Sequence, residues 1–123
     1  MEAGDTFRLR YGSHLWVVVS DPKLAPDHVL LVNMTTARGG HDPACVLKAG
    51  DHPFVKHATC MNYAASRIAS DSDMERMLSG GQIILEPPVS GAALKRIRQG
   101  AAKSDFIAID RLELLKKQGL VEP

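Results

Sequence analysis

"HLWVVVSDPKLAPDHVLLVNMTT", residues 14–36, contains two apolar runs separated by a loop that is rich in Asp and Pro. Each run is continuous, contains several β-branched residues and is bounded by residues that favour turns. Runs of this kind are typical of strands that are covered on both faces. The stretch therefore predicts two central strands of a sheet, and Trp16, inside the first run, is expected to lie in the core.

Further short segments of the same type lie on either side of this pair. They span residues 5–11, 44–48, 57–64 and 82–88. In the first, Phe7, Leu9 and Tyr11 alternate with polar residues, so they are expected to share one face of a half-buried strand. Short strands joined by compact loops favour a small antiparallel sheet curled into a barrel.

After residue 70 the apolar spacing lengthens and predicts helices. Ser70 or Ser72 can cap a first short helix, and Ser90 can cap a second over the following turns. Residues at helical spacing in the second helix are Leu94, Ile97 and Ala101. A last helix, roughly 105–118, carries a stripe of Ile109, Leu112 and Leu115 and ends before Gly119. The fold class is mainly β, with one domain over 1–123: a barrel (1–88) and a helical segment (89–123).

The composition excludes several classes of protein. The chain has 123 residues, 45% of them hydrophobic, and a formal net charge of +1. This balance argues against a protein that coats polyanions, although it leaves room for a local basic patch. No apolar run approaches the ~20 residues that span a membrane, and the first residues do not read as a signal peptide. Two cysteines make no disulfide framework, so we expect a cytoplasmic protein with reduced thiols.

The segment from 41 to 60 contains several side chains that zinc can bind: His41, Cys45, His52, His57 and Cys60. In a strand, however, His57 and Cys60 would point to opposite faces, because their positions differ by an odd number. The sequence also lacks a Cys-x-x-Cys or His-x-x-x-His pair. We therefore expect purified protein to hold no stoichiometric metal.

The strand from 57 to 64 separates its side chains into two faces. Small residues suited to the interior of a tight barrel fall on one face: Ala58, Cys60 and Ala64. The other face is mixed and carries His57, Thr59, Met61 and Tyr63. This mixed face is either a shallow binding surface or a half-exposed strand without a function. Gly50-Asp51-His52-Pro53, just upstream, predicts a turn in which His52 is structural.

Taken in order, these pieces resemble the PemK and MazF family of toxin endoribonucleases. The matching positions are Gly4-Asp5, Val17 to Ser20, Thr35-Thr36, the strand from His57, and Ser90 to Ile97. The resemblance covers most of the chain. It implies a small SH3-like antiparallel barrel with C-terminal helices, usually a homodimer, which cleaves single-stranded RNA without a metal or other cofactor. It also implies a toxin–antitoxin system, and hence an antitoxin protein as a partner.

The same resemblance implies how the site would work. The 2′-hydroxyl of the RNA is the nucleophile, so the protein must supply a base, an acid and groups that stabilise the phosphate charge. His57 is the candidate for proton transfer, because imidazole titrates near neutral pH, and Thr59 accompanies it in the catalytic pair. The residues implied to bind the substrate are Thr35, Thr36, Arg38, Lys56 and Arg67.

The chain also departs from the family pattern. His57 and Thr59 stand where the family usually has an acidic residue and a nearby basic one, and the first long loop is reduced to "YGSH", residues 11–14. A fold can persist while its chemistry changes. The alternative function is therefore a non-catalytic barrel that binds a protein or a nucleic acid.

Overall fold

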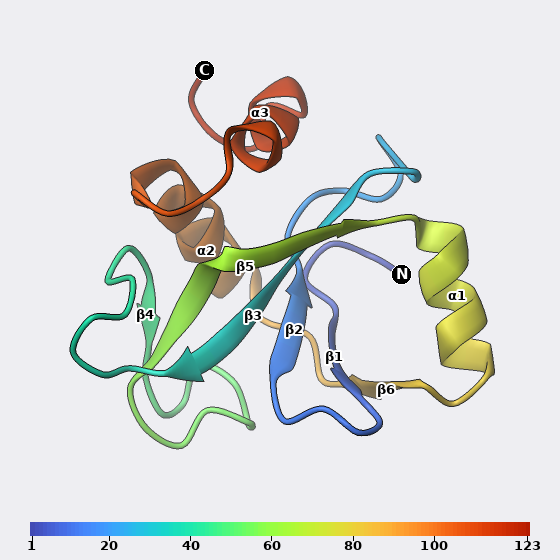
Figure 1. Cartoon of the computed structure of the whole chain (residues 1–123), viewed down its shortest axis with the longest axis horizontal. Helices are drawn as coiled ribbons and strands as arrows, with labels where there is room; N and C mark the ends of the chain where they lie inside the picture. Colours follow the sequence, from blue (N-terminus) through green and yellow to red (C-terminus); the bar gives the residue numbers. More distant parts are fainter.

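The computed structural model describes residues 1–123 and contains one six-stranded antiparallel sheet and three helices (Figure 1). In chain order the elements are β1 (Thr6–Leu9), β2 (Leu15–Val18), β3 (Val29–Thr36), β4 (Val46–Leu47), β5 (Thr59–Ala69), α1 (Asp71–Ser79), β6 (Ile83–Glu86), α2 (Gly91–Lys103) and α3 (Ile109–Lys117). The strand order in the sheet is β4-β5-β3-β2-β1-β6. The structure is mixed, with antiparallel strands and helices, which is consistent with the predicted β-rich class; the predicted helical segment after residue 89 contains α2 and α3. The sheet is open, with β4 and β6 at its two edges.

The two apolar runs of residues 14–36 form the centre of the sheet, as predicted. All four residues of β2 are buried, and Trp16 is 8% exposed. The strands are covered on both faces by separate apolar clusters. One cluster includes Ile97 from α2 and Leu115 from α3, and the other includes Met74 from α1. Figure 1 shows α2 and α3 on one side of the sheet beside β5, and α1 at the other end beside β6.

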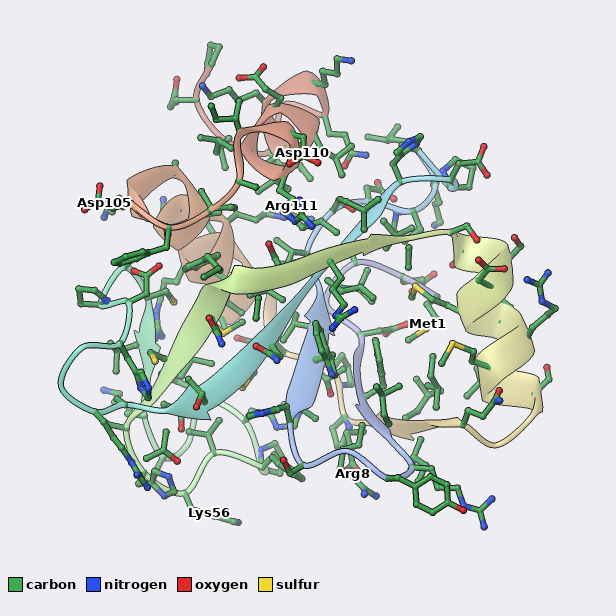
Figure 2. The ribbon with its side chains drawn as sticks, in the orientation of Figure 1. Met1, Arg8, Lys56, Asp105, Asp110 and Arg111 are labelled. Carbon is green, nitrogen blue, oxygen red and sulfur yellow. The ribbon has the colours of Figure 1, made fainter.

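β5 is longer and more bent than the sequence predicts. Leu31 of β3 pairs with Arg67, but Asn33 pairs with Asn62. The two pairs are therefore two residues apart in β3 and five residues apart in β5. This irregularity bends the strand and carries it on to Ala69. Arg111 of α3 donates from Nε to the backbone oxygen of Ser66 at 3.1 Å, which ties α3 to the bent part of β5 (Figure 2).

The predicted interior face of this strand was wrong. Met61 and Tyr63 are fully buried in the larger apolar cluster, whereas Ala58 and Ala64 are exposed. Cys60 is buried, but it lies on the opposite face of the sheet from Met61. The two large side chains fill the space between the sheet and α2, which short Ala side chains could not fill. Residue size therefore misled the prediction, because the space to be filled is set by α2.

The helix caps agree with the sequence, whereas one helix stripe does not. Ser70 and Ser90 cap α1 and α2, each by accepting a hydrogen bond from a backbone N–H three residues further on. Gly119 has φ +70°, and follows α3 as expected. α3 begins only at Ile109, which is 79% exposed, so of the expected stripe only Leu115 is fully buried. No helix combines the length and apolar character needed to cross a lipid bilayer.

Helix α2 packs very close to β5. The Tyr63 hydroxyl is buried and donates to the backbone oxygen of Ile97 at 2.6 Å. Burial also raises the pKa of this phenol, so the hydroxyl keeps its proton. Gly100 faces Tyr63 and Cys45, and a Cβ there would lie 2.6 Å from the Cβ of Cys45. The absence of a side chain at position 100 is therefore what permits this close packing.

Candidate functional site

A hollow of about 290 Å³ lies where three segments meet: the β1–β2 loop, the end of β3 and the segment that leads into β5. We call it the histidine hollow. Its polar lining residues are Ser13, His14, Thr35, Thr36, Lys56, His57 and Thr59. Figure 2 shows Lys56 at this end of the sheet. The structure therefore brings together five of the seven predicted site residues and adds two from the first loop.

The register of the sheet creates this hollow. β2 pairs with β3 only as far as Asn33, which lies opposite Trp16. β3 continues beyond that point to Thr36, paired on its other side with β5. The last residues of β3 therefore have no partner from β2, and their free edge is open to side chains from the loops on either side. Leu15 and Val55, both members of the larger apolar cluster, form the apolar wall of the hollow.

His57 is exposed at the rim, one residue after Lys56. Its Nε2 lies 2.9 Å from the Oγ1 of Thr36. The Oγ1 of Thr59 donates to the backbone oxygen of His57 at 2.9 Å. The Thr59 hydroxyl proton is therefore already committed, so Thr59 positions the backbone of His57. Of the predicted pair, only His57 presents a group that is free to act on a substrate.

His14 also lines the hollow, but it was not among the predicted site residues. In the sequence it is recognisable only as the residue that precedes the first apolar run. Its Nδ1 lies 3.0 Å from the backbone oxygen of Met34. A carbonyl oxygen only accepts, so Nδ1 carries the hydrogen and Nε2 of the neutral ring is left as an acceptor. The antiparallel pairing of two central strands places the start of one beside the end of the other. That topology was the signal that could have brought His14 to Thr35-Thr36.

The two predicted arginines lie elsewhere. Arg38 is exposed in the loop after β3 and does not line the histidine hollow. Arg67 lies over the ring of Trp16, with the guanidinium carbon 6.0 Å from the ring centroid. It lines a separate, mostly apolar hollow beside α1 that also contains Met74. Neither arginine therefore lines the histidine hollow, and the irregular register of β5 places Arg67 opposite Leu31, on the face that carries Trp16.

His52 is structural, as predicted. It is 3% exposed, and Nδ1 accepts a hydrogen bond from the backbone N–H of Phe54 at 3.0 Å. Its Nε2–H donates to the backbone oxygen of Pro87, beside the hydroxyl of Thr6. Both ring nitrogens are thus used, and the ring fastens the segment that carries Lys56 and His57 to the rest of the sheet. His52 supports the hollow without facing it.

Metal ligands do not gather anywhere in the structure. No three side chains of His, Cys, Asp or Glu lie close enough together to hold a metal ion. Cys45 and Cys60 are both buried and free, and burial raises the pKa of each thiol, so both remain protonated near neutral pH.

The histidine hollow combines two imidazoles held by different partners, one lysine and several hydroxyl groups on a partly open surface. Such a set can accept and donate protons and can stabilise an anion. No family model matches the chain, and no curated protein or solved structure gives a significant match to it.

Proposed function

We propose that the protein is a metal-independent endoribonuclease of the PemK and MazF type that cleaves single-stranded RNA in the histidine hollow. The resemblance in sequence supports this proposal. The observation that carries it is that His14 and His57 line one hollow together with Lys56 and hydroxyl groups. As parts of the same proposal, the sheet belongs to an SH3-like barrel, and the protein acts in the cytoplasm as a homodimer controlled by an antitoxin.

The different partners of the two histidines suggest different roles. His14 is held as the Nδ1–H tautomer by the Met34 carbonyl, so its Nε2 can accept the proton of a 2′-hydroxyl. His57 in its protonated form can donate a proton to the leaving oxygen. The 2′-oxygen then forms a bond to the adjacent phosphorus while the bond to the 5′-oxygen breaks. The products are a 2′,3′-cyclic phosphate and a free 5′-hydroxyl, and no water or metal enters this step.

The remaining groups act on charge and position. Lys56 is exposed at the rim, where its ammonium group can approach the phosphate oxygens whose charge grows during the reaction. Thr36 contacts Nε2 of His57 and can hold the ring in position. Thr59 fixes the backbone of His57 through its hydrogen bond to the His57 carbonyl oxygen. We therefore expect losses of these hydroxyls to slow the reaction less than loss of either imidazole.

The test is cleavage of a mixed single-stranded RNA pool by purified protein in the presence of EDTA. We expect 2′,3′-cyclic phosphate ends and a bell-shaped pH profile. His57→Ala should slow cleavage by about 10²- to 10⁴-fold, the range for one general acid or base, and should remove the falling limb at high pH. His14→Asn should remove the rising limb, because the base must be unprotonated. His28→Ala is the matched control, since this exposed histidine lies outside the hollow.

Salt dependence separates binding from chemistry. Lys56→Ala should lower the slope of log affinity against log salt by about 0.7, the value for one contact to a single-strand phosphate, without abolishing turnover. If the wild type binds RNA but leaves it intact, the non-catalytic binding function replaces the nuclease. If His57→Ala cleaves as fast as the wild type, the reaction does not use this hollow.

A further inference from the structure

A second, smaller hollow adjoins the histidine hollow on the opposite face of the sheet. It has a volume of about 130 Å³ and includes Thr35, His41, Asp42, Cys60, Asn62 and Phe106. We call it the Phe106 hollow. Thr35 lines both hollows. Because β3 has no β2 partner beyond Asn33, an extended chain can pass the free edge of β3 from one hollow to the other.

Phe106 is an exposed aromatic residue whose backbone the protein holds in place. Its side chain is 57% exposed, although apolar rings are normally buried. Its backbone N–H donates to the Oγ of Ser104 at 3.0 Å, and Ser104 donates in turn to Asp42 Oδ2 at 2.5 Å. The other carboxylate oxygen of Asp42 accepts from the backbone N–H of Ala44 at 2.9 Å. Figure 2 shows the neighbouring Asp105 at this end of α2.

This network fixes the backbone that carries the ring of Phe106. Asp42 is 9% exposed, so its hydrogen bonds are shielded from water. The same loop is fastened on its other side by His41, whose Nδ1 lies 2.8 Å from the backbone oxygen of Thr36. The loop that borders the Phe106 hollow is thus tied both to α2 and to the strand end that contacts His57. An aromatic residue on a fixed backbone has less freedom to lose when a flat ligand stacks on it than one on a mobile loop.

The wall of the Phe106 hollow offers hydrogen bonds. Asn62 lines it, and Asn33 lies directly opposite Asn62 in the pairing of β3 with β5, so the two amides share this sheet face. Asn33 does not itself line the hollow; its Oδ1 is buried and has no hydrogen-bond partner. A buried acceptor without a partner is costly and uncommon in folded proteins. The amide of Asn62, which does line the hollow, can both donate to and accept from the edge of an unpaired base.

Size and charge narrow the class of ligand. Pockets for drug-sized molecules occupy roughly 300–1,000 Å³, so the Phe106 hollow is suited to a single flat ring system. Cys60 contributes a protonated thiol to its wall, since burial raises the pKa of that group. A neutral ring that stacks on an aromatic residue and forms hydrogen bonds along one edge fits these features, as RNA bases do in single-strand recognition.

We propose that the Phe106 hollow is a subsite for one unpaired base of the RNA strand whose phosphate lies in the histidine hollow. The base stacks on Phe106, and its edge meets the amide of Asn62. The strand passes Thr35 between the two hollows. This inference rests on the proposed function for the identity of the strand, but it concerns binding and not cleavage.

The experiment measures affinity for 2′-O-methyl hexaribonucleotides, which lack the nucleophile and therefore stay intact. Phe106→Leu should weaken binding by about 5- to 100-fold, the range for one base stacked on an aromatic ring. Tyr11→Leu is the matched control, because Tyr11 is 94% exposed and lies in neither hollow. Hexamers with one abasic position should also bind more weakly, and at the stacked position Phe106→Leu should cause no further loss.

The outcomes separate this inference from the proposed nuclease. Equal affinities of Phe106→Leu and Tyr11→Leu would refute the subsite and leave the nuclease standing. Weaker binding by Phe106→Leu, with no cleavage of ordinary RNA by the wild type, would support the subsite and refute the nuclease. Binding to no hexamer at all would refute both. If the backbone NMR signals of Asn62 and Phe106 change with protein concentration alone, the Phe106 hollow is an interface between copies and the subsite is refuted.

Discussion

Gly100→Ala is expected to destabilise the protein, although the same change at an exposed helix position stabilises. Gly100 lies inside α2, where Ala is favoured over Gly by about 1 kcal/mol. A Cβ at this position, however, would overlap the hydroxyl of Tyr63 and approach the Cβ of Cys45 to 2.6 Å. Both neighbours are buried and cannot move away without disturbing the core. Core packing therefore predicts that Gly100→Ala lowers the free energy of unfolding, whereas helix propensity predicts that it raises it.

The magnitude follows from the two groups that must move. Overpacking a core by one methyl group costs about 1–3 kcal/mol. Displacing the Tyr63 hydroxyl from the Ile97 oxygen leaves a buried group unpaired, which costs about another 1–3 kcal/mol. After the gain in helix propensity, we expect a net loss of about 1–5 kcal/mol in the free energy of unfolding. Close packing of α2 against β5 thus outweighs the intrinsic preference for Ala.

Urea denaturation monitored by circular dichroism measures this loss. Gly91→Ala is the control in the same helix, because a Cβ there meets no other atom within 4 Å; it should leave stability unchanged or raise it slightly. In the background of Tyr63→Phe, which removes the overlapping hydroxyl, Gly100→Ala should cost less than it does alone. If Gly100→Ala stabilises the protein as Gly91→Ala does, the close approach of α2 to β5 is incorrect.

Two further predictions concern the core and the pH dependence. Trp16→Ala should lower the free energy of unfolding by about 3–5 kcal/mol, as for other buried aromatic residues; a loss below about 1 kcal/mol in urea denaturation would contradict its burial against Phe7 and Leu31. The hydrogen bond from Arg96 holds the pKa of Asp51 below its ordinary value of 3.8. Because the folded-state pKa is the lower one, this stabilisation is complete above that value and is lost as the pH falls through the folded-state pKa. Asp51→Asn should therefore be less stable than the wild type at neutral pH, and the difference should shrink below about pH 4; a constant difference in acid would show that the ion pair contributes nothing.

Local patterns in the sequence determined most of the elements. The apolar runs within 14–36 predicted the two central strands, because short continuous runs that are rich in β-branched residues and bounded by turn residues favour strands covered on both faces. Ser70, Ser90 and Gly119 predicted where helices begin and end, because caps satisfy backbone groups within a few residues of themselves. Both signals are local, so no knowledge of the partner elements was required.

Tertiary structure alone decided which residues share the histidine hollow. His57 and Lys56 could be placed near Thr36 only through a resemblance, and His14 was overlooked, because three segments far apart in the chain meet there. The irregular register of β5 against β3 carried Arg67 to the opposite side of the sheet. Pairing register depends on how distant strands and helices pack together, and a local pattern does not record it.

The faces of β5 show the same division. Alternation in the sequence correctly separated Cys60 from Met61, since side chains of a strand alternate whatever surrounds it. It could not show which side of the strand faces α2. Tyr63 packs closely against that helix because Gly100 has no side chain at the point of contact. The sequence by itself thus determined most of the elements, the caps of the helices and the alternation of side chains along the strands. The choice of buried face, the bend in β5 and the placement of His14 and His57 around one hollow arose only on packing, because each depends on contacts between residues distant in the chain.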